Sequence, residues 1–389
     1  MDFDTLINRA NTSSAKYDLL EKRFGRSDVI PMWIADSEFC VPEEIYQDIQ
    51  ARANHKIYGY TTIDEEAKQS IINWQKNRHN VNIDQEEILI LNGVVPSLSA
   101  CVNTYSQYQD NILIQTPIYP PFYSVIKEND RCTLENPLIE KDGHFTIDFQ
   151  DYEKQIKNTK IFILCNPHNP TGRVYTKDEL SQIVSLCKKY NVLIISDEIH
   201  ADIIYNDKKH LSLYNFDYEN IIILNSAGKS FNIAGLTCSY AIFKSKHLKI
   251  KLEKYFKKLH LTEVNIFGLT ALKSAYTNGN SYIDELIPYL NNNKKLVINE
   301  LKNTKIKALN NEGTFLMLLD CRDLNLNQKE LKEFFINKAK IALNNGLDFG
   351  DELKGYMRLN IATSKEVLDK ALKSLNKALK KDFLRQFEL

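Results

Sequence analysis

The chain has no excess of either charge and no long apolar run. Its 389 residues carry 50 Lys and Arg against 50 Asp and Glu, so the formal charge is zero. Proteins that bind nucleic acid usually carry a basic excess, and the balance argues against that class. No apolar run approaches the roughly 20 residues of a membrane-spanning helix. The N-terminal residues, MDFD, lack the basic and apolar regions of a signal peptide. We expect a soluble, cytoplasmic protein with no nucleic-acid or membrane partner.

Motifs of several cofactor and metal classes are also missing. The seven Cys are scattered without a C-x-x-C pair, and the eight His are dispersed. Neither a disulfide framework nor a metal site is therefore indicated. The sequence has no P-loop, no G-x-G-x-x-G after a predicted strand, no H-E-x-x-H and no G-x-S-x-G. None of the cofactor and hydrolase chemistries that these motifs serve is indicated.

What the chain does contain is the composition of a globular protein, with 43% hydrophobic and 26% charged residues. In its middle part, short runs that are apolar throughout alternate with helical patterns. Such runs suit strands buried on both faces, and the alternation predicts a doubly wound α/β fold with a mostly parallel sheet. The predicted strands are 87–91, 111–115, 160–165, 192–196 and 221–224, and the predicted helices are 96–108, a stretch from 121, 178–190 and 244–258.

The pattern changes after about residue 280. Long helical patterns at 282–301 and 364–379 bracket strand-like pieces at 314–319 and 356–360, which is typical of an α+β domain. The length also favours two domains, at about 100–200 residues each. We expect a large domain over 46–280 and a small domain over 281–389. The first 45 residues, with few periodic signals, would join the small domain or form an arm against a partner.

Polar and small residues follow four of the predicted strands, and such sheets bind ligands beyond the carboxyl ends of their strands. The segment 92–96, NGVVP, opens a predicted helix whose free N–H groups could hold an anion. Alone, however, it is more typical of a plain turn. The segment 166–172, NPHNPTG, concentrates turn-forming residues directly after a strand. We interpret it as a functional loop.

Asp197 and Lys229 follow the other two strands. A buried carboxylate at Asp197 would need a cation or a protonated ring nitrogen as its partner; the alternative is a helix N-cap. Lys229 lies in the small-residue turn SAGKS. There it could be a Schiff-base amine, and the alternative is a surface charge. The shared position of the four groups, rather than any single residue, indicates a site.

Taken in order, N-P-T-G at 169–172, Asp197, Ser226-x-x-Lys229 and Arg358 resemble the fold-type I, pyridoxal 5′-phosphate (PLP) enzymes of the aminotransferase class I/II superfamily. The resemblance covers essentially the whole chain, and its motifs are jointly specific. It implies a PLP cofactor. It also implies a large domain with a seven-stranded, mostly parallel sheet, joined to a smaller α+β domain.

Within that superfamily, the chain is most similar to the MalY/PatB branch of cystathionine β-lyases and cysteine-S-conjugate β-lyases. The segment PMWIADSEF at 31–39 is similar to the W-x-A-D-M-D-F segment of the branch, with Ser37 and Glu38 in place of Met and Asp. The segments YGY at 58–60, DEIH at 197–200 and KSFN at 229–232 also match it.

The resemblance implies how the cofactor ring is held. Lys229 would form the Schiff base with PLP and act as general base and acid, and Asp197 would pair with the protonated ring nitrogen. Tyr119, the third expected catalytic residue, would stack on the ring. Asn169 would donate a hydrogen bond to the phenolate oxygen of the ring. His200 would either reach the same oxygen or pack behind the site.

The resemblance also implies a phosphate site shared between two subunits. Thr237 stands where many relatives have an Arg, which removes one charge partner of the phosphate. Tyr60 would reach the phosphate of the neighbouring subunit, so a homodimer is expected. The remaining phosphate contacts would come from the backbone of Gly93, Val94 and Val95 and from the Ser226 hydroxyl.

Four residues are implied in substrate binding. Arg358 would clamp the substrate α-carboxylate as a bidentate pair. Ala35, Asn169 and Tyr119 would also contact the substrate. By the same resemblance, the bonds Thr116–Pro117 and Asn169–Pro170 are candidate cis bonds.

The implied reaction is a β-elimination. Lys229 would remove the α-proton of L-cystathionine or a related cysteine S-conjugate. Loss of the thiolate would then leave an aminoacrylate, which decays with water to pyruvate and ammonia. The released thiol is homocysteine when the substrate is cystathionine. An aminotransferase would use the same site and stays an alternative. A regulatory or partner-binding protein with this fold is a further, less favoured one. The sequence leaves the preferred sulfur amino acid open.

Overall fold

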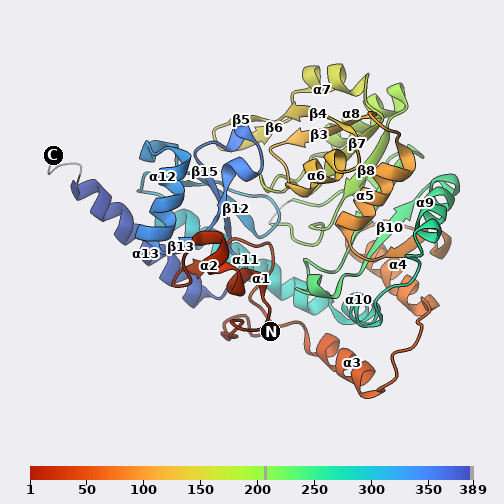
Figure 1. Ribbon diagram of the computed structural model, residues 1–389, viewed down its shortest axis with the longest axis horizontal. Helices are drawn as coiled ribbons and strands as arrows, with labels where there is room; N and C mark the ends of the chain where they lie inside the picture. The colour runs from red at the N-terminus through yellow and green to blue at the C-terminus, as the bar shows by residue number, and fades with distance from the viewer. Residues whose placement is uncertain (206–207, 386–389) are drawn as a thin grey trace.

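The computed structural model describes residues 1–205 and 208–385, and its largest element is a seven-stranded sheet (Figure 1). The strand order is β2-β10-β9-β8-β7-β3-β4, and all neighbours are parallel except the two of β10. The predicted doubly wound, mostly parallel sheet is confirmed. The strands are β2 (Ile88–Leu91), β3 (Asn111–Thr116), β4 (Cys132–Pro137), β7 (Ile161–Cys165), β8 (Leu193–Asp197), β9 (Ile221–Asn225) and β10 (Ser239–Phe243).

The central strands are apolar throughout because helices cover both faces of the sheet. Alternate residues of β7 supply different cores: Phe162 and Leu164 belong to one buried cluster, and Ile161 and Ile163 belong to another. The helices around the large sheet that contribute to the first cluster are α4 (Glu65–His79), α7 (Phe149–Ile156), α8 (Lys177–Tyr190) and α10 (Ile266–Asn278). Those of the second are α5 (Val94–Tyr105), α6 (Pro121–Lys127) and α9 (Lys246–Lys258).

A smaller, four-stranded antiparallel sheet forms the C-terminal part. Its order is β11 (Lys307–Ala308), β12 (Leu316–Asp320), β15 (Tyr356–Asn360) and β14 (Asn344–Asn345). The helices of this part are α11 (Asn280–Leu301), α12 (Gln328–Glu333) and α13 (Lys365–Arg385). The strands and helices predicted here are confirmed, and the smaller α+β part with them.

The N-terminal segment lies against this C-terminal part. β1 (Ile30–Pro31) pairs in parallel with β13 (Ile341–Ala342). Figure 1 shows α1 (Ala15–Asp18) and α2 (Leu20–Phe24), in red, beside the blue C-terminal elements, whereas α3 (Glu43–Asn54) extends away from them. The division of the chain into domains at residues 45 and 280 stays a prediction.

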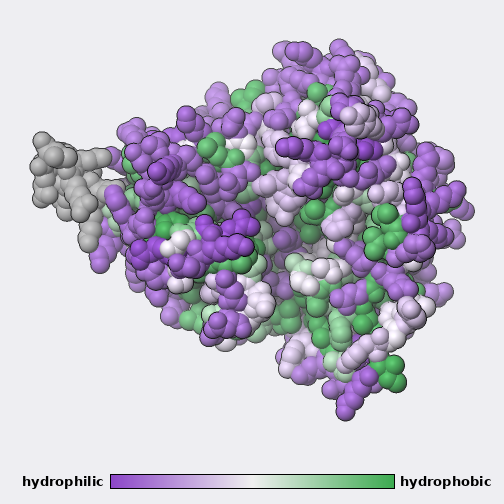
Figure 2. Space-filling model, viewed as in Figure 1, coloured by the Kyte–Doolittle hydropathy of each residue, from purple (hydrophilic) through white to green (hydrophobic). Residues whose placement is uncertain are grey.

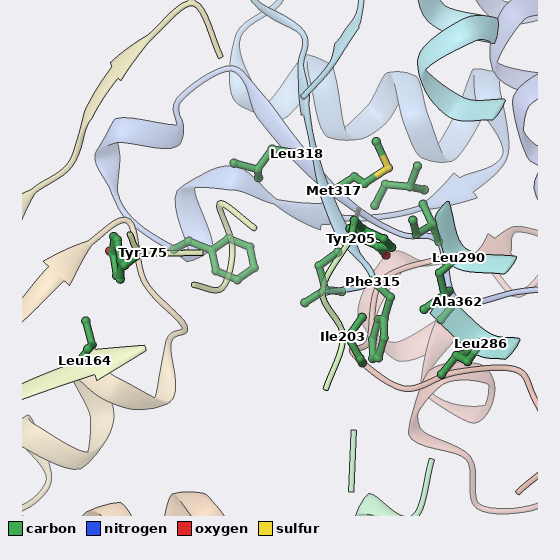
Figure 3. Packing of buried hydrophobic residues seen from close by; sticks show 14 of the residues in the cluster. Leu164, Tyr175, Ile203, Tyr205, Leu286, Leu290, Phe315, Met317, Leu318 and Ala362 are labelled. Carbon is green, nitrogen blue, oxygen red and sulfur yellow. The ribbon is translucent and has the colours of Figure 1, made fainter. Parts of the chain in front are cut away.

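The first of these clusters is continuous between the two sheets. The cluster that holds Leu164 of β7 also holds Leu318 of β12 and Leu290 of α11. Figure 3 shows part of it, with Ile203 beside Phe315 where the two parts meet. The relative position of the sheets, and of any site between them, is therefore fixed by apolar packing.

Within the described ranges, three proline peptide bonds are cis. They include Thr116–Pro117 and Asn169–Pro170, as predicted, and also Asn166–Pro167. None of the described helices is both long and apolar enough to cross a membrane.

Candidate functional site

A cavity of about 230 Å³ lies at the carboxyl edge of the large sheet. The edge collects side chains because β2, β3, β7, β8 and β9 all end there. β10 runs in the opposite direction, so the residues just before it reach the same edge. The predicted site residues that line the cavity are Ala35, Gly93, Val94, Val95, Tyr119, Asn169, Asp197, His200, Ser226, Lys229 and Thr237.

Lys229 and Asp197 are the two ionisable groups expected at the centre of the site. The Lys229 amine donates a hydrogen bond of 2.7 Å to the carbonyl oxygen of Ala35. Loss of water lowers the pKa of Lys229 to about 8, although the negative charge of Asp36 works against that shift. Burial raises the pKa of Asp197 to about 7, and a hydrogen bond from the backbone of Ile199 partly opposes this. Asp197 is thus a buried carboxylate that a nearby cation would stabilise.

Arg358 does not line the cavity but lies next to it. From β15 it donates to Asn169 Oδ1 at 2.9 Å, and it also contacts the Trp33 carbonyl and Asn344. Its guanidinium lies 4.5 Å from the ring of Phe349. Burial lowers its pKa to about 10, and Nε has no hydrogen-bond partner among the described residues. A buried guanidinium with a free N–H is suited to bind a carboxylate.

His200 is buried between these groups and the core. Burial lowers its pKa to about 3, with the positive charges of Lys229 and Arg358 adding to the effect. The ring packs edge-on against Phe315, and within the described part of the chain Nδ1 has no hydrogen-bond partner. His200 is therefore a neutral imidazole with an unsatisfied nitrogen, and both predicted roles stay open.

The predicted phosphate end lies at the start of α5. The first residues of a helix have N–H groups without intrahelical partners, and here they belong to Val94 and Val95. Gly93, at φ +104°, donates a hydrogen bond from its N–H to the Ser239 hydroxyl. The Ser226 hydroxyl accepts from the Gly228 N–H and donates to the Cys238 carbonyl. The N–H groups of Val94 and Val95 are therefore available to bind an anion. Gly93 and the Ser226 hydroxyl could bind it only by giving up their present hydrogen bonds.

Of the three remaining predicted residues, Tyr119 and Thr237 lie at the margins of the site and Tyr60 does not. Tyr119 lines the cavity after the cis Thr116–Pro117 bond, and burial raises the pKa of its hydroxyl. Thr237 reaches the edge in a left-handed turn at φ +47°, just before β10. Tyr60 is 96% exposed and lies outside the cavity. Within one subunit, the structure does not bring Tyr60 to the other residues.

Some residues that line the cavity are not among those predicted from the sequence. Cys165, Ile199 and Cys238 line the cavity without having been predicted. Cys165 directly precedes the segment 166–172, and Ile199 lies within the segment DEIH at 197–200, so the sheet topology itself could have indicated both residues. Cys238 precedes the antiparallel β10, whose direction no short sequence pattern reveals. The described residues contain no group of three His, Cys, Asp or Glu side chains that could hold a metal ion.

Comparisons with known proteins agree with this geometry. Residues 34–375 match the family described as aminotransferase class I and II. The cystathionine beta-lyase PatB of Bacillus subtilis is 36% identical over 97% of this chain and 100% of its own length. The structure of a PLP-bound putative aminotransferase from Clostridium difficile superposes with a TM-score of 0.94 at 37% identity, covering 97% of this chain and 99% of its own. Cystalysin from Treponema denticola, with a PLP cofactor, has a TM-score of 0.94 at 35% identity over 98% and 99%.

Proposed function

The chain belongs to the aminotransferase class I and II family, and from that premise we propose that it is a PLP-dependent carbon–sulfur β-lyase. Its substrate would be L-cystathionine or a related cysteine S-conjugate, and its products pyruvate, ammonia and a thiol. The observation that carries the proposal is the match, along the full length of both chains, to a cystathionine beta-lyase. The similarity to the MalY/PatB branch predicted from the sequence is confirmed by the same match.

The residues of the cavity fit PLP. The buried Asp197 carboxylate, with its pKa raised to about 7, needs a positive partner, and a protonated pyridine nitrogen would supply one. Lys229 provides an amine with a pKa near 8, the group needed for a Schiff base. The free N–H groups at the start of α5 suit a phosphate. A carboxylate, an amine and an anion site thus line one cavity.

We assign the proton transfers to Lys229. PLP, when bound, supplies an electron sink that stabilises negative charge on the substrate α-carbon. Lys229 Nζ would remove the α-proton, since its lowered pKa leaves part of the amine neutral near pH 8. The Ala35 carbonyl would hold the amine while it is free. Asp197 would keep the ring nitrogen protonated.

Arg358 and Asn169 would orient the substrate. Arg358 would bind the α-carboxylate through the N–H groups that its present contacts leave free. Asn169, which accepts from Arg358, would keep the guanidinium in place and contact the ring. With the α-carbon so fixed, the thiolate would leave from the β-carbon. Elimination would prevail over transamination if this loss is faster than the proton transfer to the cofactor that transamination needs.

An aminotransferase is the second candidate, favoured by the description of the similar Clostridium difficile structure. It would retain the amino group and need a keto acid to remove it. The test is to follow pyruvate from L-cystathionine with and without added 2-keto acid. A β-lyase releases pyruvate at the same rate in both cases. An aminotransferase would release no pyruvate: it would convert one equivalent of cystathionine to the corresponding keto acid and continue only when the added 2-keto acid removes the amino group. That result would overturn the lyase proposal in favour of the transferase.

We further propose a homodimer with shared active sites. Around the exposed Tyr60, other large side chains are exposed on and after α3, namely Tyr46, Ile57 and Tyr58. Figure 2 shows hydrophobic residues gathering at the lower right, where Figure 1 places α3 and α10. Patches of this kind mark protein interfaces. A partner subunit here would bring its Tyr60 toward the phosphate end of the cavity.

A cytoplasmic location is proposed as well. All seven cysteines are free thiols. Reducing compartments keep cysteines in this state, whereas extracellular proteins commonly pair them.

A further inference from the structure

The segment 33–39 supplies Ala35 to the cavity wall and is held from several distant parts of the chain. The amide of Asn360 donates to its carbonyl oxygens at positions 34 and 36, at 2.5 and 2.6 Å. The amide of Asn232 donates to those at 37 and 39 and accepts from the Ser37 N–H. The Glu38 N–H donates to the carbonyl of Ala362 at 2.9 Å. The Ala35 carbonyl is left for Lys229.

Two cations from the N-terminal segment hold the side chains of the same segment. Lys16 Nζ lies 2.6 Å from Glu38 and 3.1 Å from Asp36. Arg9 lies 2.6 Å from Asp36 and 2.9 Å from Glu38. We call Arg9, Lys16, Asp36 and Glu38 the ion cluster. The side chain of Lys16 is only 1% exposed and that of Glu38 12% exposed, so neither charge could remain there without its partners.

The Glu38 carboxylate has a third partner in the N-terminal segment besides the two cations. Position 38 is Glu, and its carboxylate contacts Lys16 and Arg9 while it also accepts from the Tyr17 hydroxyl at 2.9 Å. The Trp33 indole N–H donates to the Lys16 carbonyl. The N-terminal segment and the segment 33–39 are thus tied through backbone as well as side chains.

The ion cluster also acts on Lys229 through charge. The charged groups that influence this amine are Asp36, Arg358 and Asp197, which belong to three separate parts of the fold, and His200 lies in the same cavity as a neutral ring. Of the three, Asp36 has the largest effect, and it favours the protonated amine. Asp36 is fixed by Arg9 and Lys16 on one side and by Asn360 on its backbone.

We propose that Lys16 and Arg9 are positioning residues for Lys229: by pairing with Asp36 and Glu38 they fix the segment 33–39, so that the Ala35 carbonyl oxygen receives the Lys229 amine. The inference rests on the proposed function only in giving Lys229 its catalytic role. The contacts that carry it belong to the protein without cofactor.

The test uses the full-length protein without cofactor and two measurements that need no activity. Trace labelling with an acetylating anhydride, analysed by mass spectrometry, gives the pH midpoint of Lys229. Hydrogen exchange gives the protection of the Ser37 and Glu38 amides. For wild-type Lys229 we expect a midpoint near pH 8, because burial lowers the pKa of the amine. In Lys16→Met, loss of the cation beside Asp36 should raise the midpoint by roughly one pH unit. Release of the segment 33–39 should make the two amides exchange at least about 10-fold faster.

Matched variants separate positioning from loss of stability. Lys16→Arg should restore both readouts. Lys294→Met removes another lysine that is 3% exposed but contacts Asn311 instead of the segment, and should change neither. If Lys16→Met does not fold, Arg9→Met decides the matter, because that side chain is 22% exposed.

Two results would overturn the inference. One is a folded Lys16 or Arg9 variant with wild-type exchange at Ser37 and Glu38, even if the Lys229 midpoint rises, since charge alone would then explain the shift. The other is an equal effect of Lys294→Met. Failure of the proposed lyase activity would leave both measurements interpretable, because neither requires turnover.

Discussion

Asp197 and Lys229 line one cavity. Loss of water raises the pKa of the Asp197 carboxyl and lowers the pKa of the Lys229 amine, so it favours the neutral form of each group. The carboxyl has a pKa of about 7 and the amine one of about 8. The same buried environment therefore favours the neutral amine of Lys229, which can act as a base, and destabilises the Asp197 carboxylate unless a cation lies beside it. The cavity therefore suits a cofactor whose protonated ring nitrogen would pair with Asp197 and whose carbonyl group would react with the neutral amine of Lys229.

Replacing Asp197 by Asn tests the raised pKa in cofactor-free protein. The carboxyl ionises near pH 3.8 when unfolded and near pH 7 when folded. The folded state therefore binds more protons between these values, and wild-type stability falls as the pH rises through them. Asn does not titrate, so the free energy of unfolding of D197N relative to wild type should increase over that window and then level off. Urea unfolding at several pH values measures it, and a difference independent of pH would contradict the assignment.

Arg358→Lys tests the carboxylate clamp. A bidentate, charge-assisted pair contributes about 2–3 kcal/mol, and a lysine cannot reproduce its planar geometry. We expect kcat/KM for L-cystathionine to fall by about 100-fold, mostly through KM. Arg322→Lys, at a half-exposed arginine paired with Asp320, is the control and should leave the kinetics unchanged. An R358K enzyme with wild-type KM would rule out the clamp.

At the scale of elements, the loop that carries Asn169 depends on Gly172. This glycine has φ +70°, and a Cβ atom there would lie 2.3 Å from the Cβ of Asn311. Gly172→Ala should lower the free energy of unfolding by about 2–4 kcal/mol, from backbone strain and the clash together. Denaturant unfolding measures this. A Cβ atom at Gly235 would meet no atom within 4 Å, so Gly235→Ala should cost less than about 0.5 kcal/mol. Equal costs of the two substitutions would contradict the account.

Elements were predictable where local pattern and environment agree. β7, β8 and β9 are apolar throughout because both of their faces are buried, and each was predicted to within a residue or two. β4 is an edge strand that pairs only with β3 and is largely half-exposed, so its residues carry no apolar run. β10 is apolar, but only its pairing shows that it runs antiparallel.

Site residues were likewise predictable only where the local pattern of the sequence marks their position. Residues that end parallel strands, such as Asp197, were found because topology alone brings them together. Lys16 could not be found, because a lysine in a short N-terminal helix has no local mark of burial. Its contacts with Asp36 and Glu38 arise only when the N-terminal segment packs against the C-terminal part.

At the scale of the whole molecule, the continuous core between the two sheets fixes Arg358 of the small sheet relative to Lys229 of the large one. The proposed dimer adds Tyr60 from the neighbouring subunit. Tyr60→Ala and Lys229→Ala should each lower the activity strongly as homodimers. After subunit exchange, a mixed dimer carries one intact site, so an equal mixture should recover about a quarter of wild-type activity.

Mass measurement by light scattering should accompany this experiment and give two chains per particle. Recovery in the mixture requires that each active site use residues of both subunits. A Tyr60→Ala enzyme with wild-type activity would contradict the shared site, even if the protein is a dimer.

The central claim is that Lys229, in this cavity, drives β-elimination. The most direct measurement follows pyruvate and homocysteine from L-cystathionine with PLP-saturated protein and no keto acid, comparing wild type with Lys229→Ala. Wild type should release the two products in equal amounts over many turnovers, and Lys229→Ala should release neither above background. Sustained release of both products by Lys229→Ala would contradict the account.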